Sequence, residues 1–214
     1  MGKSIAVLGV GRFGRTLALE LSREGAEVLA VDRDDLIIEK IADDVTSAIA
    51  AELSDEDAIK KLGLEAMDAV VISMGSDLQA SIISIMVARE QGVPYIVAKA
   101  SSERMGAILT KIGADRVIYP EAEAGLRCAK TLLTDAIHDV LEIDADLCIL
   151  RILPFKEWIG KKLGQLDLRK RYGINVIAMR KQDQTDTRIN SDTVIPDDSE
   201  LFVLVNKEDI YRIR

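Results

Sequence analysis

Three glycines near the start of the chain have the spacing of a loop that binds phosphate groups. Gly9, Gly11 and Gly14 follow an apolar run from Ser4 to Leu8 and open a helix-like stretch that reaches Arg23. In such a loop the first glycine makes the turn, the second lets the backbone approach a phosphate, and the third lets the helix pack on the strand. The start of the helix also offers unpaired N–H groups to an anion. The sequence therefore predicts a nucleotide site, and the alternative is a turn of this shape that has lost its ligand.

Two charged residues near this loop have groups that suit a nucleotide. Asp32 ends the next strand-like run, Glu27 to Val31, where a carboxylate can bind ribose hydroxyls. Arg12 lies inside the glycine loop, and its guanidinium suits a terminal phosphate with additional negative charge. The alternatives are a helix cap for Asp32 and a surface arginine for Arg12.

The chain up to residue 120 alternates between strand-like and helix-like stretches joined by short loops. After the first two strands, further strands are expected at 45–50, 68–73, 94–98 and 115–119, with helices between them that include 78–90. This alternation predicts an α/β fold with a Rossmann-like, doubly wound parallel sheet. Ligands of such sheets bind beyond the carboxyl ends of the strands.

The residues at these strand ends are expected to line one crevice and to bind the nucleotide. They are Gly9, Gly11, Arg12, Phe13, Gly14, Asp32, Arg33, Asp34, Glu52, Leu53, Met74, Gly75, Ser76, Lys99, Ala100, Ser101, Met105 and Glu121.

Composition limits the other classes of function. The net charge of −8 argues against binding to a nucleic-acid backbone. No apolar run is long enough for a transmembrane helix, and no signal peptide is expected, because the first residues lead straight into a predicted strand. Cys128 and Cys148 do not form a close-spaced metal pair and suit a reducing cytosol.

The helix expected at Leu78–Glu90 is apolar on all sides. A helix of this kind is buried on all sides, so one face covers the sheet and the other needs a second partner. A second copy of the chain is the predicted partner, which makes the helix the seam of a homodimer. The alternative is cover by the chain's own C-terminal part.

The sequence pattern changes in the last third of the chain. A long helical pattern runs from Glu121 to Ile137, and no further strand–helix unit follows it. Strands at 147–153, 174–179 and 201–205 are expected, together with short helices at 159–163 and 166–171. We therefore predict a nucleotide-binding domain at 1–137 and a small α+β domain at 138–214.

The order of these features resembles the RCK domains (regulator of potassium conductance) of cytosolic regulatory subunits in Ktr/Trk-type potassium uptake systems. The stretches that carry the resemblance are AVLGVGRFG (6–14), VLAVD (28–32), QAS (79–81), KIGADRVIYPE (111–121) and LDLRKRYGINV (166–176). The first four resemble the RCK N-lobe, and the last resembles the small C-lobe, called TrkA-C.

The resemblance implies a nucleotide sensor and no enzymatic activity. In that family the N-lobe binds ATP or ADP, and sometimes NAD(H). The subunits form homodimers that assemble into an octameric ring below a membrane potassium-translocating subunit of the KtrB or TrkH type. Exchange of ATP for ADP reshapes the ring and gates potassium flow. The protein would then be cytoplasmic and peripherally associated with the inner face of the membrane.

The resemblance also implies roles for single residues. Arg12 would sense the terminal phosphate and Asp32 would hold the ribose. Glu121 matches a position that holds a Mg²⁺, Ca²⁺ or Na⁺ ion near the phosphates, and its alternative is an acid favoured by the helix dipole. Lys99 would line the side of the pocket that holds the adenosine, and its alternative is a solvated lysine. After the third expected strand, where many relatives have Asp or Asn at the position expected to contact adenine, this chain has Glu52.

A second ligand is implied for the C-lobe. Several relatives bind cyclic di-AMP there, and Asp167, Arg169, Asn175 and Ile177 are similar to that pattern. Gly164 departs from it, because a large aliphatic residue is expected at this position. The alternative is an Asp167–Arg169 ion pair and a turn role for Asn175.

Two rival functions remain. An NAD(P)-dependent oxidoreductase needs a catalytic acid or base, whereas the one histidine, His138, lies outside the predicted crevice and no Tyr-x-x-x-Lys pair occurs. An RCK-type sensor of another transporter would bind and sense its ligand in the same way, so the sequence does not distinguish it from a potassium regulator.

Overall fold

The computed structural model describes residues 2–132 and 137–213, which form two compact units. The N-terminal unit comprises Met1–Ala122 and the C-terminal unit comprises Glu123–Arg214. The expected domain limit at residue 137 stays a prediction.

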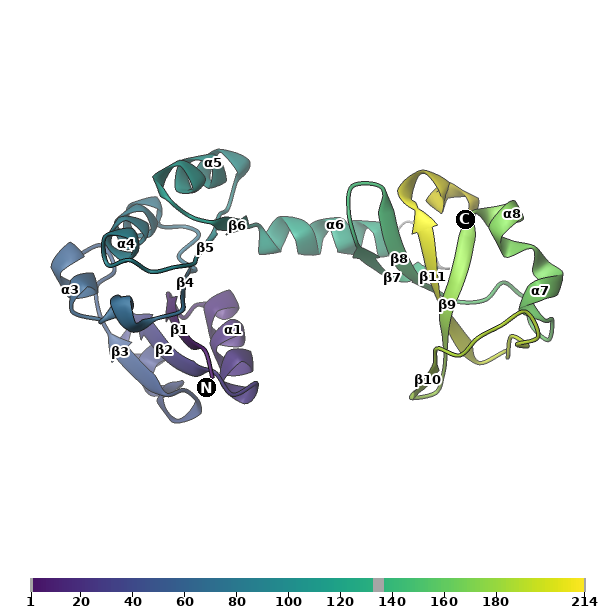
Figure 1. Cartoon of the computed structure of the whole chain (residues 1–214), viewed down its shortest axis with the longest axis horizontal. Helices are drawn as coiled ribbons and strands as arrows, with labels where there is room; N and C mark the ends of the chain where they lie inside the picture. Colours follow the sequence, from purple (N-terminus) through teal and green to yellow (C-terminus); the bar gives the residue numbers. More distant parts are fainter. Residues whose placement is uncertain (1, 133–136, 214) are drawn as a thin grey trace. The chain divides into compact units, whose positions relative to one another are not determined.

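The N-terminal unit is built on a six-stranded parallel sheet (Figure 1). The strand order is β3-β2-β1-β4-β5-β6, so the chain reverses its direction of winding between β1 and β4. The strands are β1 (Ser4–Leu8), β2 (Glu27–Asp32), β3 (Ser47–Ala50), β4 (Ala69–Ile72), β5 (Ile96–Lys99) and β6 (Arg116–Ile118). A nucleotide-binding crevice is expected at this point of reversal.

Helices cover both faces of this sheet because its strands are apolar on both sides. In β1, Ala6 and Leu8 belong to one core cluster and Val7 belongs to another. Residues of α4 and α5 join the first cluster, and residues of α1 and α2 join the second. The helices are α1 (Arg12–Arg23), α2 (Asp35–Glu39), α3 (Glu56–Lys60), α4 (Leu78–Glu90) and α5 (Glu103–Ile112), and α6 (Pro120–Leu132) follows β6. The predicted α/β class and doubly wound sheet are confirmed.

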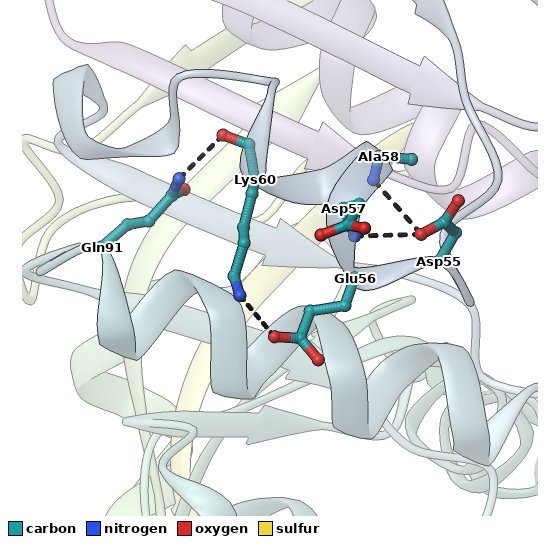
Figure 2. Close-up of polar contacts among 6 residues, drawn as sticks. All are labelled: Asp55, Glu56, Asp57, Ala58, Lys60 and Gln91. Atoms are coloured by element: carbon teal, nitrogen blue, oxygen red, sulfur yellow. Dashed lines mark hydrogen bonds and ion pairs between the residues drawn. The ribbon is translucent and has the colours of Figure 1, made fainter.

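Side chains cap several of these helices. Asp34 accepts a hydrogen bond from Leu36 at the start of α2, and Asp77 accepts one from Ala80 in α4. Figure 2 shows the start of α3, where Asp55 accepts hydrogen bonds from the N–H groups of Asp57 and Ala58. Such caps satisfy N–H groups that have no partner within the helix.

The same view shows how α3 is fastened to the end of α4. Lys60 forms an ion pair with Glu56 one turn earlier, and its backbone carbonyl accepts a hydrogen bond from the Gln91 amide at 2.9 Å (Figure 2). These contacts place α3 beside α4 on one side of the sheet.

Helix α4 differs in part from its prediction. Its predicted bounds are confirmed, and Ala80, Ile85 and Val87 are buried in the N-terminal unit. Met86 is 48 % exposed and Leu78 is 38 % exposed, so within this single chain the helix is not covered on all sides. The homodimer seam stays a prediction.

The C-terminal unit is a small α+β domain, as predicted, and its sheet has five antiparallel strands. The sheet order is β10-β9-β11-β8-β7 (Figure 1). Its elements are β7 (Ile137–Glu142), β8 (Leu147–Ile152), α7 (Leu163–Leu166), α8 (Leu168–Tyr172), β9 (Ile174–Lys181), β10 (Gln184–Asp186), β11 (Ser199–Asn206) and a 3-10 helix, Lys207–Ile213. Trp158 is fully buried in the core of this unit.

The helix predicted from Glu121 to Ile137 is wrong at its end. Helix α6 ends at Leu132, residues 133–136 lie outside the described part, and Ile137 begins β7, where it pairs with Ile152. The apolar residues of this stretch fit a helical period as well as a strand. The pairing of β7 with β8 across the C-terminal sheet decides between the two.

Candidate nucleotide-binding site

A pocket of about 750 Å³ lies at the carboxyl ends of the parallel strands. Its lining includes thirteen of the predicted residues: Gly9, Gly11, Asp32, Arg33, Asp34, Glu52, Leu53, Met74, Gly75, Ser76, Lys99, Ser101 and Glu121. The crevice expected at the point where the strand order reverses is therefore present, and its volume suits a nucleotide-sized ligand.

The glycine loop is held tightly on one side and open on the other. Gly9 has a φ of +91°, its N–H donates to the carbonyl of Val31 at 2.7 Å, and its carbonyl accepts a hydrogen bond from the Ser73 hydroxyl. A Cβ on Gly14 would overlap that same carbonyl, whereas a Cβ on Gly11 would meet no atom within 4 Å. The open space at Gly11 lies where a phosphate would approach the start of α1.

Asp32 is fastened to the glycine loop. One carboxylate oxygen, Oδ2, accepts a hydrogen bond from the Val10 N–H at 2.7 Å, and Oδ1 accepts one from the Asp34 N–H at 3.1 Å. Each oxygen retains a lone pair for a ribose hydroxyl. The cap of α2 is provided by Asp34, and not by Asp32.

Lys99 and Glu121 form an ion pair in the pocket. The distance from Lys99 Nζ to Glu121 Oε1 is 2.6 Å, and Lys99 is 15 % exposed whereas Glu121 is 70 % exposed. The hydrogen bond from the Lys99 ammonium lowers the pKa of Glu121. The stem of Lys99 passes Gly75, where a Cβ would lie 3.1 Å from the Lys99 Cε, and its ammonium lies 5.9 Å from the centre of the Phe13 ring.

Acidic groups outnumber basic groups in the pocket lining. The acids are Asp32, Asp34, Glu52, Asp77 and Glu121, and the bases are Arg33 and Lys99. Most of these acids already accept hydrogen bonds. Glu52 accepts bonds from the hydroxyl and the N–H of Ser54, which lower its pKa, and Asp34 and Asp77 cap helices.

Five predicted residues do not line this pocket: Arg12, Phe13, Gly14, Ala100 and Met105. Arg12 is exposed at the first position of α1, next to the open side of the loop. Gly14 and Ala100 are buried behind the lining, and Met105 is buried with its Sδ 3.6 Å from the Ser101 hydroxyl. These residues support the walls of the pocket or flank its opening.

Four lining residues were missed by the sequence reasoning: Ile37, Ser73, Asp77 and Ala80. Ser73 and Asp77 flank the predicted stretch Met74–Ser76, so a wider window after β4 would have included them. Ile37 and Ala80 lie in the first turns of α2 and α4, and no local signal in the sequence marks them.

The described residues contain no group of three or more His, Cys, Asp or Glu side chains that could hold a metal ion. Glu121 offers a single carboxylate, and the Lys99 ammonium is bound to it. This donor set fits a cation only where ligand phosphates supply the other oxygens, which is a common arrangement for Mg²⁺.

The C-terminal unit has a smaller pocket, of about 300 Å³, next to α7 and α8. Asp167, Arg169 and Asn175 line it, whereas Ile177 does not line it and is 38 % exposed on β9. Among the described contacts no ion pair joins Asp167 to Arg169. Asp167 has a φ of +48°, which is uncommon for a residue other than glycine.

The contacts of Gly164 explain why this chain has a glycine at that position. Its N–H donates to the carbonyl of Ser191 at 2.9 Å, and a Cβ there would lie 3.0 Å from the Cβ of Ser191. A side chain at this position would therefore require Ser191 to shift.

The fold and the pocket define a class: a Rossmann-type domain with a pocket at the carboxyl ends of its strands, joined to a small antiparallel α+β domain. The TrkA-N domain model matches residues 5–120, and the TrkA-C domain model matches residues 149–214. The chain belongs to the TrkA-N and TrkA-C family, as the resemblance to RCK regulators implied.

The relatives agree with this assignment. The chain is 33 % identical to Ktr system potassium uptake protein C of Bacillus subtilis, across 99 % of this chain and 96 % of that protein. It is 30 % identical to Ktr system potassium uptake protein A of the same species, across 98 % of this chain and 95 % of that protein. The crystal structure of the GsuK RCK domain matches it with a TM-score of 0.67 at 17 % identity, covering 100 % of this chain and 47 % of that one. The chain is thus a homologue of Ktr potassium uptake proteins with the RCK fold.

Proposed function

We propose that this protein is a nucleotide-sensing regulatory subunit of a membrane potassium uptake system. The observation that carries the proposal is the pocket at the glycine loop, where Gly11 leaves the start of α1 open and Asp32 lies beside it. The similarity of almost the whole chain to Ktr potassium uptake proteins supports the coupling of this site to potassium transport.

Adenine nucleotides are the proposed ligands, with ATP and ADP as the pair that is distinguished. Arg12 is exposed beside the open side of the loop and has no described side-chain hydrogen bond, so its guanidinium is available to a terminal phosphate. NAD(H) is the second candidate, because the contact between Asp32 and a ribose would be the same in both ligands.

Glu121 is the proposed carboxylate for a cation, Mg²⁺, Ca²⁺ or Na⁺, bound next to the phosphates. Such an ion would neutralise phosphate charge in a pocket whose lining is mostly acidic. Glu121 would bind the ion, and Lys99 would compete with the ion for that carboxylate, because its ammonium is bound to Oε1.

Regulation, and not a chemical reaction, is the proposed role of the bound nucleotide. Ligands can change the shape of an assembly only when they bind its forms with different affinity.

We propose that the subunits form homodimers, with Met86 and Leu78 of α4 at the seam, and assemble into an octameric ring on a membrane subunit. None of the described helices is long and apolar enough to cross a membrane. The proposed location is the cytoplasmic face of the cell membrane.

Cyclic di-AMP is the proposed second ligand, at the pocket beside α7 and α8. The left-handed backbone of Asp167 and the exposed Arg169 support a polar ligand at this pocket. Five basic residues lie nearby in the sequence and favour a dianion: Lys161, Lys162, Arg169, Lys170 and Arg171. Ile177 lies outside the pocket lining, so in this single chain its contribution is unsupported.

Calorimetric titration of the purified chain with ATP, ADP, NADH and cyclic di-AMP tests these proposals. We expect ATP and ADP to bind at one site with different affinities, and cyclic di-AMP to bind independently of both. Tight binding of NADH alone would contradict the ATP/ADP switch. Potassium flux through a Ktr-type membrane subunit, measured with and without this chain, then separates a potassium regulator from a sensor of another transporter.

A further inference from the structure

Lys99 is placed where two different anions can reach it. It ends β5, its stem passes Gly75 in the loop after β4, and its ammonium lies 5.9 Å from the centre of the Phe13 ring in the first turn of α1. That first turn is also where the glycine loop leaves space for a phosphate. In the structure the ammonium is bound to Glu121, at 2.6 Å.

Burial makes the two partners unequal. Lys99 is 15 % exposed and is confined by its neighbours, whereas Glu121 is 70 % exposed at the start of α6. The cation is therefore the fixed partner, and the carboxylate can swing into solvent at little cost. Ion pairs with one exposed partner are weak, so a phosphate group with two or more negative charges can displace the carboxylate.

We propose that Lys99 is a shared cation whose ammonium exchanges Glu121 for a phosphate group of the bound nucleotide. Glu121 competes with the ligand in the absence of nucleotide and is released from Lys99 when the ligand binds. Glu121 belongs to the first turn of α6, and the boundary between the two compact units falls within this helix. The exchange therefore breaks an ion pair that joins the pocket to α6. This inference rests on the proposed function, since it takes a nucleotide as the ligand.

The competition predicts an unusual sign for one substitution. In buffer with EDTA and no divalent cation, Glu121→Gln should bind ADP roughly two- to fivefold more tightly than the unaltered chain, because Lys99 is no longer paired with an anion. Lys99→Met keeps most of the stem and should weaken ADP binding about tenfold or more, while adenosine binds almost unchanged.

The double variant Lys99→Met with Glu121→Gln identifies the mechanism. If the two groups exchange, the gain from Glu121→Gln disappears when Lys99 is absent. If the gain remains, Glu121 acts only by repelling the phosphates, and the exchange is refuted. Glu123→Gln is the matched control, because it removes an exposed acid of the same helix that does not line the pocket, and it should leave ADP affinity unchanged.

The outcomes separate this inference from the proposed function. An unaltered chain that binds none of the tested nucleotides overturns the proposed function and, with it, the exchange. An unaltered chain that binds ADP, with a Glu121→Gln variant of equal or lower affinity, overturns only the exchange. Lys99→Gln serves as a second variant if Lys99→Met does not fold, as judged by circular dichroism.

Discussion

The Val10 N–H donates a hydrogen bond to Asp32 Oδ2 at 2.7 Å, so the acid that ends β2 also holds the glycine loop. Gly9 is held in the same loop by the Ser73 hydroxyl at the end of β4. The loop is thus fastened to the strands on both sides of β1 before any ligand binds. A phosphate that bound here would meet a loop formed in advance, which reduces the entropy that binding must overcome.

The first prediction concerns the double role of Asp32. Asp32→Asn replaces a carboxylate by a neutral amide of the same shape, so we expect ADP affinity to fall about tenfold and the free energy of unfolding to fall by about 1 kcal/mol. Calorimetry and urea denaturation measure the two effects. Asp44→Asn, in the exposed 3-10 turn Ala42–Asp44, is the control. An unchanged ADP affinity would show that Asp32 holds only the loop.

The second prediction separates two glycines of the same loop. A Cβ at Gly14 would overlap the Gly9 carbonyl, so Gly14→Ala should lower the free energy of unfolding by about 2–4 kcal/mol. Gly11 has a φ of −65° and no atom near its absent Cβ, so Gly11→Ala should change stability by less than about 0.5 kcal/mol. The Gly11 variant should nevertheless bind ADP about tenfold more weakly, because its methyl group takes the space of the phosphate. Full ADP affinity in a folded Gly11→Ala protein would place the phosphate elsewhere.

The third prediction concerns the distinction between ATP and ADP. Arg12→Ala should weaken ATP binding more than ADP binding and so reduce the ratio of the two affinities, by about tenfold if the guanidinium contacts the terminal phosphate directly. Arg15→Ala is the matched control, because Arg15 lies in the same helix and donates instead to the Lys40 carbonyl at 3.4 Å. Equal losses for both nucleotides would make Arg12 a simple phosphate anchor.

The fourth prediction concerns pH and the Asp115 carboxylate. Its pKa is lowered by the hydrogen bond from the Ile96 N–H and by the ion pair with Arg89. A lowered pKa means that the stabilisation is present above the ordinary pKa and is lost as the pH falls through the folded-state value. We expect Asp115→Asn to cost about 1–2 kcal/mol at neutral pH, with a smaller difference from the unaltered chain below about pH 4.

Urea denaturation across this pH range checks the Asp115 prediction. Asp197→Asn removes an exposed acid without a described partner and should leave the curve unchanged. A cost for Asp115→Asn that is equal at all pH values would mean that shape, and not charge, explains it.

The fifth prediction concerns the exposed side of α4. If Met86 packs against a second copy of the chain, Met86→Lys should lower the molar mass in light scattering to that of a monomer, because a lysine would be buried without a partner. The stability of the monomer should hardly change, since Met86 is 48 % exposed there. Leu36→Lys, at a site 63 % exposed on α2, is the control. An unchanged mass would place the interface elsewhere.

Much of the N-terminal unit could be predicted because its signals are local. Each strand is a short apolar run, and caps such as Asp55 and Ser102 mark the helix starts that the structure has. Strands β7 and β10 were not predicted. The residues of β7 fit a helical period, and β10, Gln184–Asp186, is a polar hairpin strand whose pairing with β9 is not visible in composition.

The sequence by itself determined the alternating fold, the glycine loop and the acid that ends β2, because each depends on residue types within a short window. The tertiary structure alone decided which distant groups meet. Lys99 and Glu121 are separated by a whole helix–strand unit, and Ser73 is far along the chain from Gly9, yet the parallel sheet brings each pair into contact at one edge. No local pattern encodes such contacts, because they depend on the order and register of the strands.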